Sequence, residues 1–375
     1  MGKDYHFKMP GEELQSKTID FLRFPLIVGV VFIHTNFSDI VIPGAKQFSL
    51  AHYPIFSHIF FLFSNIIFEV CVPLFFFISG FLFFYKTTDF SKAVYLQKLK
   101  NRLRSLLIPY IFWNLLVLLF LLLAQTFLSG SLVSGRNKLI MDYSVMDWLW
   151  SFWDTSQVNP HFNKSLPINT PFWFIRDLMV LVVFSPLIYF LIRKVGVYAV
   201  IALGLLWFFN PYVYKPGWST VSLFFFTAGA YFSVHKMNFV AVMQPMLRGA
   251  LPLYILIIIL TFYFVGSDWW PYLYCAAVVM GLITTVALCA HYLRKGSWHT
   301  NSFLANGSFF IFAFHRLPLI FVIKFLFKVL RPQSEGLLLF LYLACPAIII
   351  VFGLIGYSML KQVWPRFTAT ICGGR

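Results

Sequence analysis

Apolar runs of about 20 residues recur along nearly the whole chain, and they limit its possible folds more than any other feature. A helix needs that length to cross roughly 30 Å of hydrocarbon, because it rises about 1.5 Å per residue. Of the 375 residues, 60% are hydrophobic and only 11% are charged. A soluble domain cannot bury so much apolar surface, so the sequence predicts a polytopic membrane protein.

We expect an all-α bundle of about ten transmembrane helices. The predicted spans lie near residues 19–38, 60–85, 103–128, 171–192, 196–210, 218–235, 250–266, 270–292, 304–327 and 336–360. The apolar stretch before the second span is too long to cross the membrane once, so residues 53–60 are expected to lie along the interface.

These spans leave no room for a second soluble domain, so residues 1–375 are predicted to form one membrane domain. It comprises a polar leader at 1–18, a large external loop at 129–170 and a C-terminal tail at 361–375. The leader has mixed charges and no small-residue cleavage site, so no cleavable signal is expected.

The formal net charge of +16 reflects basic residues that flank the spans. They form no patch on a folded domain, so membrane topology explains them and no nucleic-acid partner is expected. Basic residues alternate between connections, as at 86–104 and 193–194, which predicts that both termini are cytoplasmic and 129–170 is external. A basic cluster at 324–331 falls on the outer side and is the main exception.

The five cysteines are Cys71, Cys275, Cys289, Cys345 and Cys372. Their spacing matches no pattern of metal ligands, and most of them lie within predicted spans. We therefore interpret them as small core residues and expect no metal site.

The first predicted span contains Arg23 and His34 within the otherwise almost wholly apolar segment 21–34. Eleven residues turn a helix by roughly 1100° and advance it by about 16 Å, so the two side chains lie within about 20° of one face. Snorkelling to an interface would explain either residue alone. Two ionisable residues on one face indicate a functional site, because such groups are costly in hydrocarbon.

The second predicted span holds a lone carboxylate and a pair of small residues. Glu69 needs a partner or a proton, and we expect it to lie level with His34, where it would orient that imidazole or pair with Arg176. Ser79 and Gly80 permit the close approach of another helix or of a ligand. From composition alone, helix packing is the favoured explanation of this pair.

Two later spans also contain polar residues. Trp173, Arg176 and Asp177 open the fourth span, where Trp173 alone would be an interfacial residue and Arg176 a surface anchor. Adjacent helical residues do not face each other, so we expect Arg176 and Asp177 to have different partners. His315 and Arg316 lie near the middle of the ninth span, and a pair at that depth predicts a polar interior cavity.

Taken in order and spacing, these residues resemble the acyltransferase-3 family of integral membrane acyltransferases. The matching positions are Arg23 and His34 as Arg-x10-His, the Pro-Leu-Phe-Phe-Phe-Ile-Ser-Gly-Phe-Leu stretch at 73–82, the basic run at 98–110, the motif at 172–178, and His315. The likeness runs from about residue 17 to about 360. The basic run has Arg102-Leu103-Arg104 where some members have Arg-x-x-Arg, and the resemblance assigns no role to Glu69.

The resemblance implies a stand-alone membrane form that acylates an acceptor presented from outside, commonly a sugar hydroxyl of a lipid-linked or surface polysaccharide. It also implies a place in the bacterial cytoplasmic (inner) membrane. The donor implied is an acyl-coenzyme A, with acetyl-coenzyme A as the expected form. The resemblance therefore implies a membrane O-acyltransferase that transfers an acyl group from a cytoplasmic donor to a hydroxyl of an extracytoplasmic or lipid-linked glycan.

The chemistry of the candidate residues gives each a predicted role. Neutral His34 suits a general base that removes the proton of an attacking hydroxyl, with Glu69 as the second catalytic residue. Arg23 stays protonated and is predicted to hold donor phosphate or carbonyl oxygens. The predicted donor-binding residues are Arg23, Ser79, Lys100, Arg102, Arg104 and Arg316, and the predicted acceptor-binding residues are Trp173, Arg176, Asp177 and His315. Plain topology explains the charges at 86–104 equally well.

Two other functions fit parts of this pattern. A non-enzymatic exporter or flippase would use Arg23, Glu69, Arg176 and His315 as a polar path, and inverted repeats or helices broken by Gly or Pro at matching positions would favour it. The sequence alone reveals neither feature. A polyprenyl-phosphate-dependent glycosyltransferase would have acidic residues in its first outer loop, where Asp39 is the single candidate.

Overall fold

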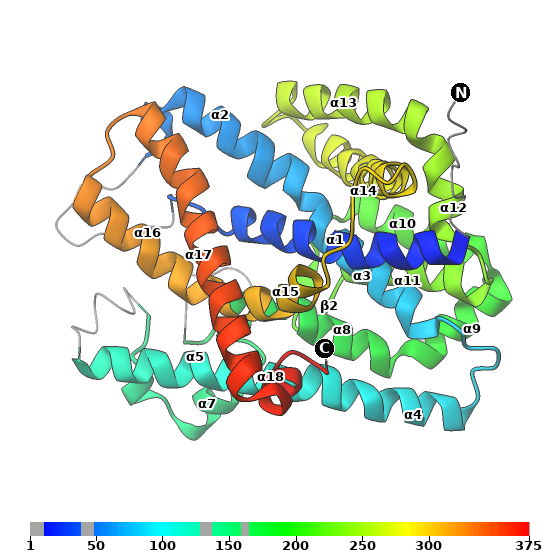
Figure 1. The fold of residues 1–375 in the computed structure, drawn as a ribbon, viewed down its shortest axis with the longest axis horizontal. Helices are drawn as coiled ribbons and strands as arrows, with labels where there is room; N and C mark the ends of the chain where they lie inside the picture. The colour runs from blue at the N-terminus through cyan, green and yellow to red at the C-terminus, as the bar shows by residue number, and fades with distance from the viewer. Residues whose placement is uncertain (1–10, 39–48, 128–136, 159–164, 375) are drawn as a thin grey trace, which may run out of the picture.

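A computed structural model describes residues 11–38, 49–127, 137–158 and 165–374. All regular secondary structure in these residues is helical, apart from one antiparallel hairpin of β1 (Tyr214–Lys215) and β2 (Trp218–Ser219). Figure 1 shows α1 running through the middle of the bundle, with α4 and α5 along one side and α13 along the other. The class is therefore all-α, with one very short hairpin added.

The helices range from short surface turns to one of 29 residues. They are α1 (Gly11–Ile33), α2 (Pro54–Leu62), α3 (Cys71–Phe84), α4 (Lys92–Arg102), α5 (Ile108–Phe127), α7 (Val145–Ser151), α8 (Trp173–Val183), α9 (Ser185–Val195), α10 (Val197–Phe209), α11 (Thr220–Val234), α12 (Phe239–Met243), α13 (Leu247–Tyr263), α14 (Trp270–Arg294), α15 (Ser302–Phe314), α16 (Arg316–Leu330), α17 (Glu335–Val363) and α18 (Pro365–Ile371). Short 3-10 or π-helical segments are η1 (Leu50–His52), η2 (Phe63–Ile67), η3 (Phe68–Val70), η4 (Leu103–Leu107), η5 (Ile140–Asp142), η6 (Thr170–Phe172) and η7 (Gln244–Met246).

Five continuous helical stretches in the described residues are long and apolar enough to cross a membrane, or seven if each of two bent pairs forms one span. The five are Pro54–Phe84, Lys92–Phe127, Phe239–Tyr263, Trp270–Arg294 and Glu335–Val363. This confirms an all-α membrane protein with several spans. The figure of about ten spans and the sides of the termini stay predictions.

The helices depart from the predicted spans at three places. Helix α2 is not separate from the second span, because it continues through η2 and η3 into α3, and the interfacial position of residues 53–60 stays a prediction. The predicted span 171–192 bends by 64° between α8 and α9, and 304–327 bends by 69° between α15 and α16. Pro186 and Pro318 follow the two bends, where proline removes a backbone donor and cannot continue the preceding helix.

The bundle is tightest where α3 meets α11. A Cβ on Gly80 would lie 2.0 Å from the carbonyl oxygen of Phe226, and one on Gly229 would lie 1.8 Å from that of Phe77. The helices can meet backbone to backbone only because both positions lack a side chain. Helix packing therefore explains Gly80, as composition favoured, whereas its neighbour Ser79 lines a cavity.

Candidate functional site

The helix α1 presents its polar residues to two adjoining cavities. Arg23 and Val30 line a cavity of about 150 Å³, which we call the Arg23 cavity. Val30 and His34 line a cavity of about 300 Å³, which we call the His34 cavity. Val72 of α3 also lines both. The structure thus places Arg23 and His34 along one face of α1, as their eleven-residue spacing predicts.

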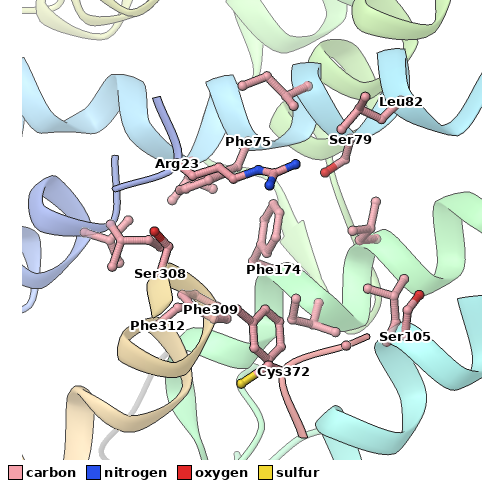
Figure 2. Close-up of a pocket in the computed structure, with 18 of the residues that line it drawn as sticks. Arg23, Phe75, Ser79, Leu82, Ser105, Phe174, Ser308, Phe309, Phe312 and Cys372 are labelled. Atoms are coloured by element: carbon pink, nitrogen blue, oxygen red, sulfur yellow. The ribbon is translucent and has the colours of Figure 1, made fainter. Parts of the chain in front are cut away.

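The Arg23 cavity combines cationic and apolar walls. Arg23 extends toward the Ser79 side of this space, and aromatic rings such as Phe174 and Phe312 line it (Figure 2). Nη1 of Arg23 lies 3.1 Å from Oδ1 of Asp20, an ion pair within the first helix. The cavity therefore offers a cation at one end and hydrophobic contact along its length.

The C-terminal segment completes the wall of this cavity, which the sequence interpretation of residues 361–375 as a tail did not predict. Cys372 and Gly373 line the cavity, and the indole Nε1 of Trp113 donates to the carbonyl oxygen of Ile371 at 3.0 Å. Gly373 has a φ of +76°, and a Cβ there would lie 2.5 Å from the carbonyl oxygen of Ser105. The consecutive glycines at 373–374 were the one signal in the sequence for this close approach.

The three predicted donor residues of the basic connection, Lys100, Arg102 and Arg104, have separate environments. Arg102 lines the Arg23 cavity, and its guanidinium lies 5.8 Å from the centre of the Phe83 ring. Arg104 instead lines an open groove of about 460 Å³ beside Gly373 and Gly374, and Lys100 is exposed on α4. Ser105 and Gly373 line both the groove and the Arg23 cavity, so the two spaces adjoin at that point.

The His34 cavity gathers residues from distant parts of the chain. Glu69 lies in its wall and accepts a hydrogen bond from the Tyr274 hydroxyl at 2.9 Å. Trp173 packs edge-on against the ring of Tyr214, with ring centres 5.8 Å apart. The sequence interpretation missed Tyr214 and Tyr274, because a two-residue strand and a mid-helix tyrosine give no local signal of a site.

The bend between α15 and α16 brings His315 and Arg316 to His34. The rings of His34 and His315 lie 5.2 Å apart between centres, and Nη1 of Arg316 donates to the His34 carbonyl oxygen at 3.2 Å. Nδ1 of buried His315 lies 2.7 Å from the carbonyl oxygen of Phe312, so this nitrogen carries the proton and Nε2 is the acceptor. Among the described residues, Nε2 has no hydrogen-bond partner.

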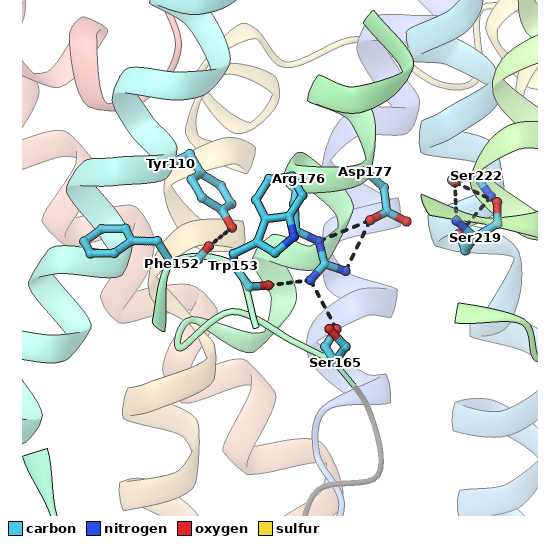
Figure 3. A network of polar contacts seen from close by, with 8 residues as sticks. All are labelled: Tyr110, Phe152, Trp153, Ser165, Arg176, Asp177, Ser219 and Ser222. Atoms are coloured by element: carbon cyan, nitrogen blue, oxygen red, sulfur yellow. Dashed lines mark hydrogen bonds and ion pairs between the residues drawn. The ribbon is translucent and has the colours of Figure 1, made fainter. Parts of the chain in front are cut away.

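Arg176 ties the segment before α8 to the helix (Figure 3). Its Nη1 donates to the carbonyl oxygens of Trp153 at 2.6 Å and Ser165 at 3.2 Å. Its Nη2 lies 3.3 Å from Oδ1 of Asp177, and both side chains are buried. The expectation of different partners holds in part: Asp177 also hydrogen-bonds to Ser219 and Ser222, but Arg176 turns back to pair with its neighbour as well.

The polar cluster around Arg176 shows that this residue holds a wall of the His34 cavity in place. Its charge is already compensated by Asp177 and two carbonyl oxygens. No group of three or more His, Cys, Asp or Glu residues suitable for a metal occurs within the described ranges. Asp39, the acidic candidate of the glycosyltransferase alternative, lies outside those ranges.

The chain is similar in sequence to proteins of one known family. The profile of a family described as "Acyltransferase domain" matches residues 16–357. The chain is also 25% identical over 377 residues to "Succinoglycan biosynthesis protein ExoH" of Rhizobium meliloti (strain 1021), with 96% of this chain and 92% of that protein covered. No solved structure matches the chain. Because the profile covers most of the chain, including the lining residues of both cavities except Cys372 and Gly373, the protein belongs to the acyltransferase-3 family of integral membrane acyltransferases.

Proposed function

We propose that the protein transfers an acetyl group from cytoplasmic acetyl-coenzyme A to a hydroxyl of an extracytoplasmic or lipid-linked glycan, in the bacterial cytoplasmic membrane. The observation that most supports this is the junction of two chemically different cavities at Val30 and Val72. Family membership supports acyl transfer. The relative named for succinoglycan biosynthesis supports a polysaccharide acceptor.

The Arg23 cavity suits the donor. The pantetheine arm of coenzyme A is long and narrow, with methyl and methylene groups between its two amides, and it would lie among the aromatic walls between Arg102 and Arg23. Its amides and carbonyls can bond to the two guanidinium groups and the Ser79 hydroxyl. The phosphates would stay outside, near Arg104 in the adjoining groove. The thioester would then reach the junction below His34.

The His34 cavity suits a sugar. Trp173, Tyr214 and Tyr274 offer flat apolar surfaces with polar edges. The hydroxyl oxygens of Ser165 and Thr170 are buried in this region without a hydrogen-bond partner among the described residues. Buried polar atoms are costly unless they are bonded, so a polyhydroxylated ligand would complete the site.

The transfer step follows from the placement of His34. Its neutral imidazole takes the proton of the acceptor hydroxyl while the oxygen attacks the thioester carbonyl carbon. The new C–O bond forms, the C–S bond breaks, and the thiolate of coenzyme A leaves with the proton that His34 then returns. Arg316 fixes the His34 backbone, and the His315 ring packs beside the His34 ring with 5.2 Å between their centres.

The test is an acyl-transfer assay in proteoliposomes with labelled acetyl-coenzyme A outside and candidate polysaccharides inside, or the reverse. His34→Ala should remove transfer while the protein inserts normally. His299→Ala is the matched control, because His299 is exposed in the connection after α14. Transfer by His34→Ala at the full rate would contradict the proposal.

A separate labelling experiment tests sidedness. We propose that both termini and residues 86–104 are cytoplasmic and that the connection 129–170 is external. The five native cysteines are buried, so single cysteines introduced in the two connections can be labelled with an impermeant reagent in sealed cells. Labelling of 86–104 alone would reverse the proposed donor and acceptor sides.

Transport is the alternative. The bends at α8–α9 and α15–α16 give the chain two broken helices, a feature common in transporters. A flippase would move lipid-linked saccharide without acetyl-coenzyme A. Movement of unacylated saccharide by His34→Ala at the wild-type rate, with no acylated product from either protein, would favour this alternative.

A further inference from the structure

A third cavity, of about 210 Å³, lies apart from the two already described. It opens where the start of α1 meets the ends of α3 and α11. Phe81 and Tyr85 line it, whereas Ser79 and Leu82 line the Arg23 cavity, so α3 separates the two spaces. We call it the Gln15 cavity, after a buried glutamine in its wall.

Two buried oxygen atoms in the wall of the Gln15 cavity have no partner within the described part of the chain. They are Oε1 of Gln15 and Oγ of Ser233, on side chains that are 4% and 7% exposed. A buried polar atom without a hydrogen bond destabilises the fold, so native proteins seldom leave one unmatched. Oε1 can only accept, so its missing partner must be a donor.

The rim of this cavity carries charge of both signs. Lys86 and Lys236 line it, as does Glu12. The two lysines lie at the ends of α3 and α11 and have φ angles of 57° and 55°. A side chain at such an angle is strained, and strained positions concentrate at functional sites. Two helix ends therefore each direct a cationic residue to the same cavity at some conformational cost.

These features together favour a ligand with an anion at one end and a hydrogen-bond donor at the other. A phosphodiester suits two lysine ammonium groups, because its oxygens accept charge-assisted hydrogen bonds. An ammonium or hydroxyl group suits Oε1 of Gln15 and the carboxylate of Glu12. Phe81, Tyr85 and Met237 supply apolar contact beside them.

We propose that the Gln15 cavity binds the headgroup of a glycerophospholipid that carries an N–H or O–H donor, as phosphatidylethanolamine or phosphatidylglycerol does. The site lies at the end of the apolar stretch Pro54–Phe84, where a membrane helix meets lipid headgroups. This inference does not depend on acyl transfer.

The test uses three lipids that share a phosphodiester. Phosphatidylethanolamine and phosphatidylglycerol have a donor beyond the phosphate, whereas phosphatidylcholine has none. Added to the purified protein in detergent, the first two should raise Tm by several degrees more than phosphatidylcholine. Native mass spectrometry should show the same order of retention. Equal shifts for the three lipids would overturn the proposal.

Substitutions in the wall of the Gln15 cavity test whether the lipid-dependent shift in Tm arises there. Gln15→Leu and the milder Ser233→Ala should abolish the preference over phosphatidylcholine, and Lys86→Gln with Lys236→Gln should reduce the response to all three lipids. Gln362→Leu and Lys295→Gln are exposed controls that should keep the full preference. A preference that persists in both Gln15→Leu and Ser233→Ala would refute the site. Equal shifts from soluble phosphoethanolamine would refute the lipid as its source.

Discussion

The Arg23 cavity and the His34 cavity share two valines but differ in size and chemistry. The first is about 150 Å³ and has aromatic walls with guanidinium groups, whereas the second is about 300 Å³ and has unmatched hydroxyl oxygens. In the proposed function, a narrow arm fits the first and a broad polar ring fits the second. The comparison teaches that α1 and the residue that follows it can direct one ionisable side chain to each of two different spaces.

Removal of the His34 side chain is the most direct test that the two cavities have different roles. His34→Ala should lower kcat by about 10²–10⁴-fold, the usual contribution of a positioned base, while both KM values change little. Steady-state acyl transfer in detergent or proteoliposomes measures this. A fall in donor affinity instead would mean that His34 belongs functionally with the Arg23 cavity.

A substitution of His315 tests whether this residue takes part in proton transfer or only positions His34. His315→Gln should reduce kcat less than His34→Ala, because His315 touches the base rather than the acceptor in the proposed mechanism. The limb of the pH–rate profile in which the rate rises with pH, the signature of a general base, should persist in His315→Gln and disappear in His34→Ala. Identical profiles for the two variants would make the histidines one functional unit.

Substitutions in the two cavities should change the KM of different substrates. Arg23→Gln should raise the donor KM by about 10–100-fold, as expected for losing a charge-assisted hydrogen bond worth about 1.5–3 kcal/mol, and leave the acceptor KM unchanged. Trp173→Ala should do the reverse, with an effect of about 10-fold from lost aromatic contact. Initial rates with each substrate varied in turn give both constants. Parallel changes in the two KM values would show that the cavities do not bind separate substrates.

The junction between the two cavities can be altered by substitution. Val30 and Val72 line both cavities, and in the proposed mechanism an acyl group from the Arg23 side passes between them. A narrow passage selects by cross-section, and therefore Val72→Ala should raise the rate with isobutyryl-coenzyme A relative to butyryl-coenzyme A by about 10-fold. Val72→Leu should lower that ratio. An unchanged ratio in both variants would place the acyl path elsewhere.

The two regions were not equally predictable from the sequence. Helix α11 (Thr220–Val234) lies within the predicted span 218–235, because apolar length and the flanking polar residues determine where a membrane helix ends. The shared face of Arg23 and His34 follows from helical periodicity alone. The bends after α8 and α15 were not predicted, since a proline in an apolar run can either kink a helix or end it.

Residues brought into the site by tertiary packing were also beyond the sequence. Tyr214 reaches the His34 cavity from a short hairpin, and Cys372 reaches the Arg23 cavity because Trp113 holds the chain after α18. Each lies far in sequence from the residue, Arg23 or His34, that gives its cavity a name. Periodicity identifies the face of one helix, but it contains no information about which distant segment will pack on that face.

The basic connection allows a finer test on the donor side. Arg104→Gln should raise the donor KM by about 2–5-fold at low salt and less at high salt, because its charge is exposed and screened. Lys100→Gln should have no effect, since Lys100 is exposed outside the groove that Arg104 lines. Lys295→Gln controls for net charge. Equal changes in all three variants would indicate general attraction of an anionic donor rather than a groove.

The smallest expected effect lies in the segment that adjoins the His34 cavity. The hydrogen bond from Lys138, together with the backbone N–H of Ser144, lowers the pKa of Asp147 from 3.8 to about 2. The stabilisation of α7 is therefore fully present above pH 3.8 and is lost as the pH falls toward 2. The fluorescence of neighbouring tryptophans should change over that range and not in Asp147→Asn, which lacks the titrating group. Because Arg176 bonds to Trp153 just after α7, loosening this helix by Asp147→Asn should raise the acceptor KM at neutral pH more than the donor KM. A larger rise in the donor KM of Asp147→Asn would contradict the assignment of this segment to the acceptor side.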